Sequence, residues 1–309
     1  MKFLIIAQDL RVSGTSEGIV SRSFLAKLRK IYPESIIDVV YLKQIPSDDQ
    51  MDLLPVDSIS EHVLNLKIPI AVKWIHKLYW RFFHISLLNK HIEKIYAGHI
   101  KKIDYLKYDH IFIRSAGVNH ETILGAKDLP ILKKAIINFH DPYPSFWYPG
   151  STSCLTGLEL FKLKEMQSIV SQSKKCMSPA HYLSQDLEML YGCRKKFYTL
   201  PHQYDDGVFD LSDASQIFKK SKKILISYRG AVIVGRDIEA LLDAYAELIF
   251  FNETYKENTE FVIRVKGANL KKLAAKYRTT PNIKILDLIN FSNSCNEQVH
   301  EADITIVLE

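Results

Sequence analysis

The fold of this 309-residue chain is decided near its N-terminus, where residues 2–42 read KFLIIAQDLRVSGTSEGIVSRSFLAKLRKIYPESIIDVVYL. Residues 2–7 are a short apolar run of the kind that forms a buried parallel strand. Small, turn-forming residues follow, and a helical pattern over 20–28 then ends before Pro33. Residues 36–42 form a second apolar run. The order strand, loop, helix, strand predicts a βαβ unit, in which helices cover a parallel sheet.

The same alternation extends along the chain, with two interruptions in the first half. Residues 43–65 are polar and irregular, and one long helical pattern covers 69–100. We predict an α/β protein with two Rossmann-like domains, over 1–205 and 223–309, joined by a linker over 206–222. Further strands are predicted at 110–114, 135–139, 196–200, 224–227, 261–265, 283–286 and 303–308. Further helices are predicted at 157–171, 180–191, 237–250 and 270–277, and in a segment that runs to 301.

The net charge of +6 is concentrated in one segment of the chain. Residues 66–102 carry eight Lys or Arg residues and one acidic residue, a net charge of +7. Cations beside aromatic rings on one helix suit an anionic membrane surface. A core helix with a solvated basic stripe is the alternative. The charge comes without a nucleic-acid-binding motif, so no nucleic-acid partner is expected. The predicted membrane patch consists of Lys73, Lys77, Arg81, Trp74 and Trp80.

Two loops at predicted strand ends in the first domain carry groups suited to a ligand. Ser13, Gly14 and Thr15 lie between the first strand and its helix, where backbone can approach a phosphate closely and helical N–H groups are free. A tight turn with a Ser or Thr cap is the alternative. His140 follows the strand at 135–139, and ligands bind beyond the carboxyl ends of parallel strands. For His140 the alternative is a histidine that caps a turn.

The second domain has a similar loop between its first strand and first helix. Gly230 permits a sharp turn there, with Arg229 before it and Arg236 at the start of the helix. Arginines beside free helical N–H groups form a sound diphosphate site. Lys266 adds a cation after the next strand. Surface arginines at a helix terminus are the alternative.

The order of these segments resembles a known family, the retaining glycosyltransferases of group 1. Its members include capsule and lipopolysaccharide enzymes and glycogen synthase, and they have the GT-B architecture of two facing Rossmann-like domains. Each motif is short, and their order along nearly the whole chain carries the resemblance. The matching segments are Phe139–Asp141, Ser178–Ala180 leading to Tyr191–Gly192, Leu200–Asp205, Gly230–Leu241 and Ala302–Ile306.

The resemblance implies a role for each matched position. His140 would contact the donor sugar near the reacting carbon, and Arg236 would bind the donor diphosphate. Gly230 would let its loop approach that diphosphate, with Arg229 and Lys266 nearby. Leu286 would lie near the nucleobase. Residues 13–15 would border the acceptor and the donor phosphate.

The implied reaction moves a sugar from a nucleotide-sugar donor to a saccharide or lipid-linked acceptor in cell-surface polysaccharide synthesis. The donor is a substrate, and neither a cofactor nor a metal is implied. The family's paired glutamates lie beyond the strand at 303–308, so we expect a second domain that is incomplete at its C-terminus. A catalytically inactive sugar-nucleotide or membrane-binding module is one alternative, and a sugar-nucleotide epimerase of similar architecture is another.

The sequence also bears on location. No apolar run reaches the roughly 18 residues that a transmembrane helix needs. The four cysteines show neither a CxxC pair nor metal-ligand spacing, which indicates reduced structural thiols. We therefore expect a cytoplasmic protein that associates peripherally with the inner face of the cytoplasmic membrane.

Overall fold

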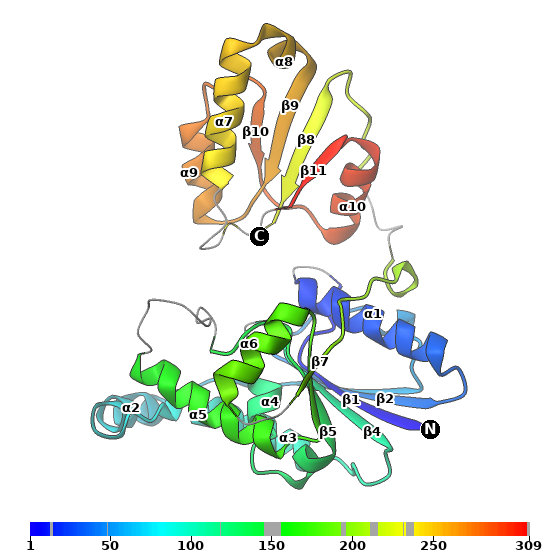
Figure 1. Ribbon diagram of the computed structural model, residues 1–309, viewed down its shortest axis with the longest axis vertical. Coiled ribbons are helices and arrows are strands. Elements are labelled where there is room, and N and C mark those ends of the chain that lie inside the picture. The colour runs from blue at the N-terminus through cyan, green and yellow to red at the C-terminus, as the bar shows by residue number, and fades with distance from the viewer. Residues whose placement is uncertain are drawn as a thin grey trace. The chain divides into compact units, whose positions relative to one another are not determined.

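The computed structural model describes residues 1–12, 15–47, 49–117, 119–144, 156–192, 196–210, 216–230, 232 and 238–307. The chain divides into two compact units, Met1–Phe209 and Asp210–Glu309, each built on a parallel sheet (Figure 1). Their boundary falls within the segment predicted as a linker. Residues 206–209 belong to the first unit, where the buried Arg22 Nε donates to the Val208 carbonyl at 2.9 Å.

The first unit holds a seven-stranded sheet in the order β3-β2-β1-β4-β5-β6-β7. The central β1 (Lys2–Ala7) pairs in parallel with β2 (Ile36–Lys43) on one side and with β4 (His110–Arg114) on the other. The strand order therefore reverses between β1 and β4, and this switch point is where doubly wound sheets bind ligands. The remaining strands are β3 (Ser58–Val63), β5 (Ala135–Asn138), β6 (Lys175–Ser178) and β7 (Phe197–Thr199).

Helices cover both faces of this sheet because alternate strand residues point to opposite faces. On one face Leu4 and Ile6 join a core with Tyr96 and Met166 from the covering helices. On the other face the Phe24 ring of α1 (Ser16–Ile31) lies 5.2 Å from the Phe112 ring. The first face is covered by α3 (Leu87–Ile100), α4 (Glu121–Gly125), α5 (Gly157–Gln172) and α6 (His181–Tyr191).

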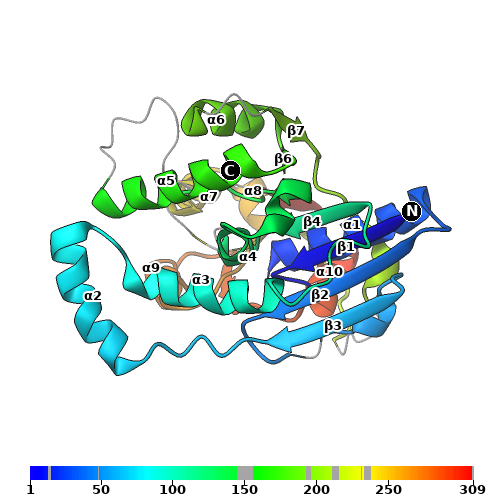
Figure 2. The same ribbon diagram turned by 90° about the horizontal axis from the view of Figure 1, so that it is seen from below.

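The helix predicted over 69–100 is wrong as a single element. The chain forms α2 (Ile70–Phe83) and then α3, and Figure 2 shows α2 standing apart from the sheet. His84 takes a left-handed conformation with φ of 52°, and the Ser86 hydroxyl caps α3 by accepting from the Asn89 N–H at 3.3 Å. Because Ile85 fits the apolar period of the preceding residues, periodicity alone did not show the break.

Two strands of the first sheet were not predicted. Residues 43–65, expected to be irregular, contain a short 3₁₀ turn at Met51–Leu53 and the strand β3. β3 is a largely exposed edge strand, so it lacks the apolar alternation that reveals a half-buried strand. β6 spans only four residues, and two of these, Cys176 and Ser178, are buried. The other strands and helices predicted in the first unit lie within a few residues of their observed positions.

The second unit is a four-stranded parallel sheet in the order β10-β9-β8-β11. Its core joins Leu242 and Tyr245 of the first helix to Phe261 and Ile263 of β9. The strands are β8 (Ile224–Arg229), β9 (Thr259–Arg264), β10 (Ile283–Leu286) and β11 (Ile304–Ile306). The helices are α7 (Ile238–Phe251), α8 (Glu253–Asn258), α9 (Ala268–Lys276) and α10 (Phe291–His300). The prediction of two Rossmann-like α/β domains is confirmed. Within the described ranges, no helix has the length and apolar content needed to cross a bilayer.

Candidate functional site

A buried arginine lies at the switch point of the first sheet. Arg114 is the last residue of β4 and is 2% exposed. Its guanidinium stacks on the Phe24 ring at 4.4 Å, and its Nε donates to the Ser21 hydroxyl at 3.3 Å. Burial lowers the pKa of Arg114 to about 9. Among the described residues its Nη1 has no hydrogen-bond partner, so the site contains a cation that is not fully satisfied.

His140 lies beside this cation, two residues beyond the end of β5. The backbone N–H of His140 donates to the Ser115 hydroxyl at 3.1 Å, and its ring Nε2 lies 3.2 Å from Arg114 Nη2. A guanidinium can only donate, so Nε2 accepts, and the neutral ring carries its hydrogen on Nδ1. Burial, and then the charge of Arg114, lower the pKa of His140 well below its ordinary value. His140 is therefore a neutral imidazole whose Nδ1–H has no acceptor among the described residues.

Further polar groups surround this pair. The His202 ring, beyond the end of β7, lies 5.5 Å from the His140 ring. The carboxylates of Glu17 and Asp141 converge on Gly117, which has a φ of 57°. A β-carbon on Gly117 would lie 2.5 Å from Glu17 Oε1 and 3.1 Å from Asp141 Oδ2. The left-handed backbone therefore favours glycine at this position, whereas the two carboxylates lie at the ends of flexible side chains.

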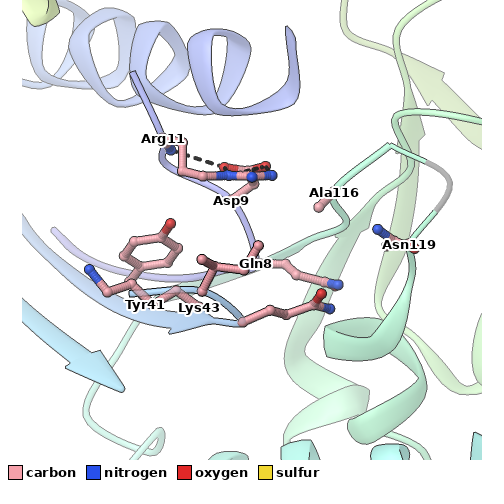
Figure 3. A pocket seen from close by; sticks show the side chains of 9 residues that line it. Gln8, Asp9, Arg11, Tyr41, Lys43, Ala116 and Asn119 are labelled. Atoms are coloured by element: carbon pink, nitrogen blue, oxygen red, sulfur yellow. Dashed lines mark hydrogen bonds and ion pairs between the residues drawn. The ribbon is translucent and has the colours of Figure 1, made fainter. Parts of the chain in front are cut away.

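A small hollow adjoins the switch point, at the carboxyl ends of β1, β2 and β4 (Figure 3). Gln8, Asp9 and Asn119 present carboxylate and amide groups along it, and the volume is about 40 Å³. That volume exceeds the roughly 10–15 Å³ that one water needs. In this conformation it admits water or a hydroxyl group rather than a whole sugar ring. The full lining is Gln8, Asp9, Arg11, Tyr41, Lys43, Gln44, Ile45, Ala116 and Asn119.

The polar side chains of this hollow are held in place from behind. The side-chain oxygen Oε1 of Gln8 accepts from both the backbone N–H and the hydroxyl of Thr122, each at 3.1 Å. The Gln8 amide nitrogen donates to Glu121. Asp9 forms an ion pair with Arg11 at 2.6 Å. These groups are thus fixed before any ligand arrives, as a binding site requires.

The loop predicted to bind phosphate is only partly within the described residues. Ser13 and Gly14 lie outside them. The Thr15 hydroxyl caps α1 by accepting from the Gly18 N–H at 3.3 Å, the alternative stated for this loop. A β-carbon on Gly18 would collide with the Arg11 carbonyl, so the start of α1 packs directly on the loop that leaves β1.

In the second unit the predicted arginine is paired internally. The Arg229 guanidinium forms an ion pair with Glu297 of α10 and also donates to the Ser294 carbonyl. Glu297, 2% exposed, additionally accepts from Arg264 Nε at 2.7 Å. Burial lowers the pKa of Arg229, and the charge of Glu297 opposes that effect. The charge of Arg229 is therefore used within the unit, and donor binding by this residue stays a prediction.

Three other predicted donor residues lie at one edge of the second sheet. Gly230, Lys266 and Leu286 follow or end the adjacent strands β8, β9 and β10, whose carboxyl ends meet there. Lys266 is exposed, and Gly267 after it has a φ of 77° where α9 begins. Arg236 lies outside the described residues. The structure thus collects the described part of the predicted donor site at one edge.

The predicted membrane patch lies on α2. Lys73, Lys77, Arg81 and Trp74 are exposed, whereas Trp80 is half-buried. Trp80 lies near Gly157, where α5 begins. Trp80 therefore attaches the helix to the unit, and the other four residues face solvent.

Several groups of the first-unit site were missed from the sequence. Arg114 had a readable signal, because a lone cation closes the apolar run Ile111–Ile113. Gln8 and Asn119 had none, since polar residues in loops are common and only the pairing of β1 with β4 brings their loops together.

No protein-family model and no curated protein sequence matches this chain. Solved structures do resemble it. WaaG, a glycosyltransferase involved in lipopolysaccharide biosynthesis, is 12% identical with a TM-score of 0.61, over 98% of this chain and 74% of that one. The catalytic domain of starch synthase IV from Arabidopsis thaliana, bound to ADP and acarbose, is 12% identical with a TM-score of 0.59, over 99% and 77%.

An epimerase has a similar structure. UDP-GlcNAc 2-epimerase from Neisseria meningitidis, bound to UDP-GlcNAc, is 12% identical with a TM-score of 0.55, over 97% of this chain and 76% of that one. At such identities the similarity establishes the fold, which is the GT-B fold with two Rossmann-like domains.

Proposed function

We propose that this protein is a glycosyltransferase that moves a sugar from a nucleotide-sugar donor to a saccharide or lipid-linked acceptor in cell-surface polysaccharide synthesis. The observation that carries the proposal is the Arg114–His140 pair at the carboxyl edge of the first sheet. A neutral imidazole whose Nδ1–H has no acceptor among the described residues, backed by a buried cation, suits a ligand oxygen that carries partial negative charge. The fold shared with solved glycosyltransferases supports the same proposal.

In this proposal the residues have distinct roles. His140 donates its Nδ1–H to an oxygen of the donor sugar, and Arg114 fixes the tautomer that makes this donation possible. Arg236 and the N–H groups at the start of its helix bind the diphosphate and stabilise its charge as it leaves. Gln8, Asp9 and Asn119 bind acceptor hydroxyls. Retention of the anomeric configuration follows only from the family resemblance.

The first test measures release of free nucleotide from a panel of UDP- and ADP-sugars, with saccharide acceptors and with a lipid extract. We expect His140→Ala to lower the rate by about a hundredfold, the typical effect of losing one directed donor. His110→Ala is the matched control, because His110 begins β4 and therefore lies at the amino-terminal ends of the strands, away from His140. Equal loss in both variants would remove His140 from the mechanism. Repeating the assay with EDTA tests independence from metal.

The second test concerns the diphosphate. Arg236→Ala should weaken nucleotide binding measured by calorimetry, whereas Arg278→Ala, which changes an exposed arginine in the same unit, should not. Unchanged affinity in Arg236→Ala would exclude the assigned diphosphate site. Nucleotide binding without turnover of any donor would favour the inactive binding module.

An epimerase is the second candidate function, favoured by the structural similarity to UDP-GlcNAc 2-epimerase. The two functions differ in their products. Transfer releases nucleotide and lengthens an acceptor, whereas epimerisation interconverts sugars without an acceptor. NMR of the products from UDP-GlcNAc with and without acceptor separates them, and the anomeric signal of a transferred sugar reports retention or inversion.

A further inference from the structure

The helix α2 exposes large apolar side chains on a unit that otherwise buries its core. None of its 14 residues is buried. At about 100° per residue, the apolar side chains occupy an arc of roughly 220° around the helix. Seven of them are between 41% and 72% exposed: Ile70, Trp74, Ile75, Leu78, Tyr79, Phe82 and Phe83. Folded proteins rarely expose so many large apolar side chains together, and a patch of this kind indicates an interaction site.

The side of α2 next to the Phe83 end of the apolar arc attaches the helix to the first unit. Val72, His76 and Trp80 are the half-buried residues of the helix, and their spacing of four places them on one side. The Trp80 and His84 side chains lie close to Gly157, where α5 begins. The attachment meets one end of the apolar arc and leaves its seven large side chains exposed.

A basic stripe borders the apolar arc. Lys73, Lys77 and Arg81 repeat every four residues and are exposed. None of them takes part in the ion pairs found among the described residues. Lys77 Nζ lies 5.5 Å from the Trp74 ring centroid, so a cation and an interfacial aromatic share one spot on the surface.

We infer that α2 docks on the surface of a bilayer rich in anionic phospholipid. Its 14 residues span about 21 Å, less than the roughly 30 Å hydrocarbon core, so the helix lies in the interface and does not cross it. Trp and Tyr favour the headgroup level, and the basic stripe meets lipid phosphates. A second copy is a poor occupant, because it would bring together two segments that each carry a net charge of +7.

The docking surface lies at the same end of the first unit as the candidate site. The segment that leads to α2 leaves the carboxyl end of β3, and Figures 1 and 2 both show α2 on the side toward which the strands point. A bilayer held there would present a lipid-borne substrate near that edge. This consequence rests on the proposed transfer, whereas the docking of α2 does not.

The experiment is sedimentation of the full chain with vesicles of phosphatidylcholine alone or with 30% phosphatidylglycerol. We expect binding to the anionic vesicles, weakened by salt and reduced by about a hundredfold or more in K73E/K77E/R81E, because each cation contributes on the order of a fivefold factor. The matched control is K133E/K134E/K174E. It makes the same charge change with exposed lysines just before β5 and β6, at the amino-terminal ends of these strands.

A fluorescence measurement locates the contact independently of charge. In a variant with Trp80→Phe and Trp147→Phe, Trp74 is the sole tryptophan. Its emission should shift to shorter wavelength with anionic vesicles and stay unchanged without lipid at any protein concentration. Absence of vesicle binding, equal loss in the control, or a lipid-independent shift that grows with protein concentration would each overturn the inference; the last would indicate self-association. Nucleotide release with a soluble saccharide separates this result from failure of the proposed transfer.

Discussion

Each unit of this protein ends a central parallel strand in an arginine whose side chain is buried, and the two arginines have opposite surroundings. Arg229, at the end of β8, is neutralised by Glu297, which also binds Arg264. Arg114, at the end of β4, faces the neutral ring of His140 and takes part in none of the ion pairs found among the described residues. A buried cation with a carboxylate holds a domain together, whereas one without a carboxylate is available to an incoming anion or oxygen.

The largest expected effect is on the paired arginine. Glu297→Gln would leave two guanidinium groups without their shared anion and should destabilise the second unit by about 3 kcal/mol. Hydrogen exchange with mass spectrometry should show core amides of that unit exchanging about a hundredfold faster, with the first unit unchanged.

Glu253→Gln is the control for this prediction, because Glu253 forms an exposed ion pair with Lys256 and such pairs contribute little. If core amides of the second unit exchange at an unchanged rate in Glu297→Gln, its arginines do not depend on their carboxylate. The proposed difference between the arginines of the two units would then be wrong.

The second prediction concerns pH. Because the pKa of His140 is lower in the folded state than its ordinary value of 6.5, the unfolded chain binds this proton more readily. The contribution of neutral His140 to the free energy of unfolding is therefore complete above pH 6.5 and is lost as the pH falls below that value. The slope of this contribution approaches about 1.4 kcal/mol per pH unit. Urea unfolding followed by tryptophan fluorescence reports this unit, since Trp74, Trp80 and Trp147 all belong to it.

His140→Gln should flatten this slope between pH 6.5 and 5. His202 and His99, whose pKa values burial also lowers, contribute to the remaining pH dependence with the same sign. Glu93, whose pKa burial raises to about 7, contributes with the opposite sign over this range. The second unit contains one histidine, His300. The amide hydrogen-exchange rates of the second unit, corrected for intrinsic pH dependence, should change far less over the same range. A wild-type slope equal to that of His140→Gln would show that the ring is not held neutral by its surroundings.

The smallest effect is expected from Arg114→Met. Removing this cation leaves no carboxylate without its partner, so the free energy of unfolding should change by less than about 1 kcal/mol. The same change should raise the pKa of His140, because the charge of Arg114 contributes to lowering it. NMR titration of the His140 ring measures this shift. A loss of several kcal/mol would mean that Arg114 is structural in the same sense as Arg229.

How far the sequence predicted the molecule depended on the range of the interactions involved. The buried strands β1, β4 and β5 and the helix α1 follow from runs of apolar residues that any buried element must carry. The exposed edge strand β3 carries no such pattern, because its hydrogen bonds to β2 require no apolar side chains. The break at His84 depended on a cap and one left-handed residue, which apolar spacing does not report.

The candidate site shows the same division. His140 was predicted because it follows a buried strand, and the carboxyl edge of a parallel sheet is determined once the strands are known. Its tautomer depends on Arg114, 26 residues earlier, and was not predictable. Nor was the pairing of Arg229 with Glu297, since the two residues meet only when α10 packs beside β8.

Residue patterns along the chain are enough to predict the α/β class, the order of most elements, the strand ends that carry polar groups and the cationic aromatic helix. Local apolar periodicity and turn chemistry encode all of these. Tertiary structure alone decided which cations are neutralised, which imidazole nitrogen carries its hydrogen and which side of α2 stays exposed. Those properties depend on groups brought together from distant parts of the chain, where burial and neighbouring charge control ionisation and hydrogen bonding.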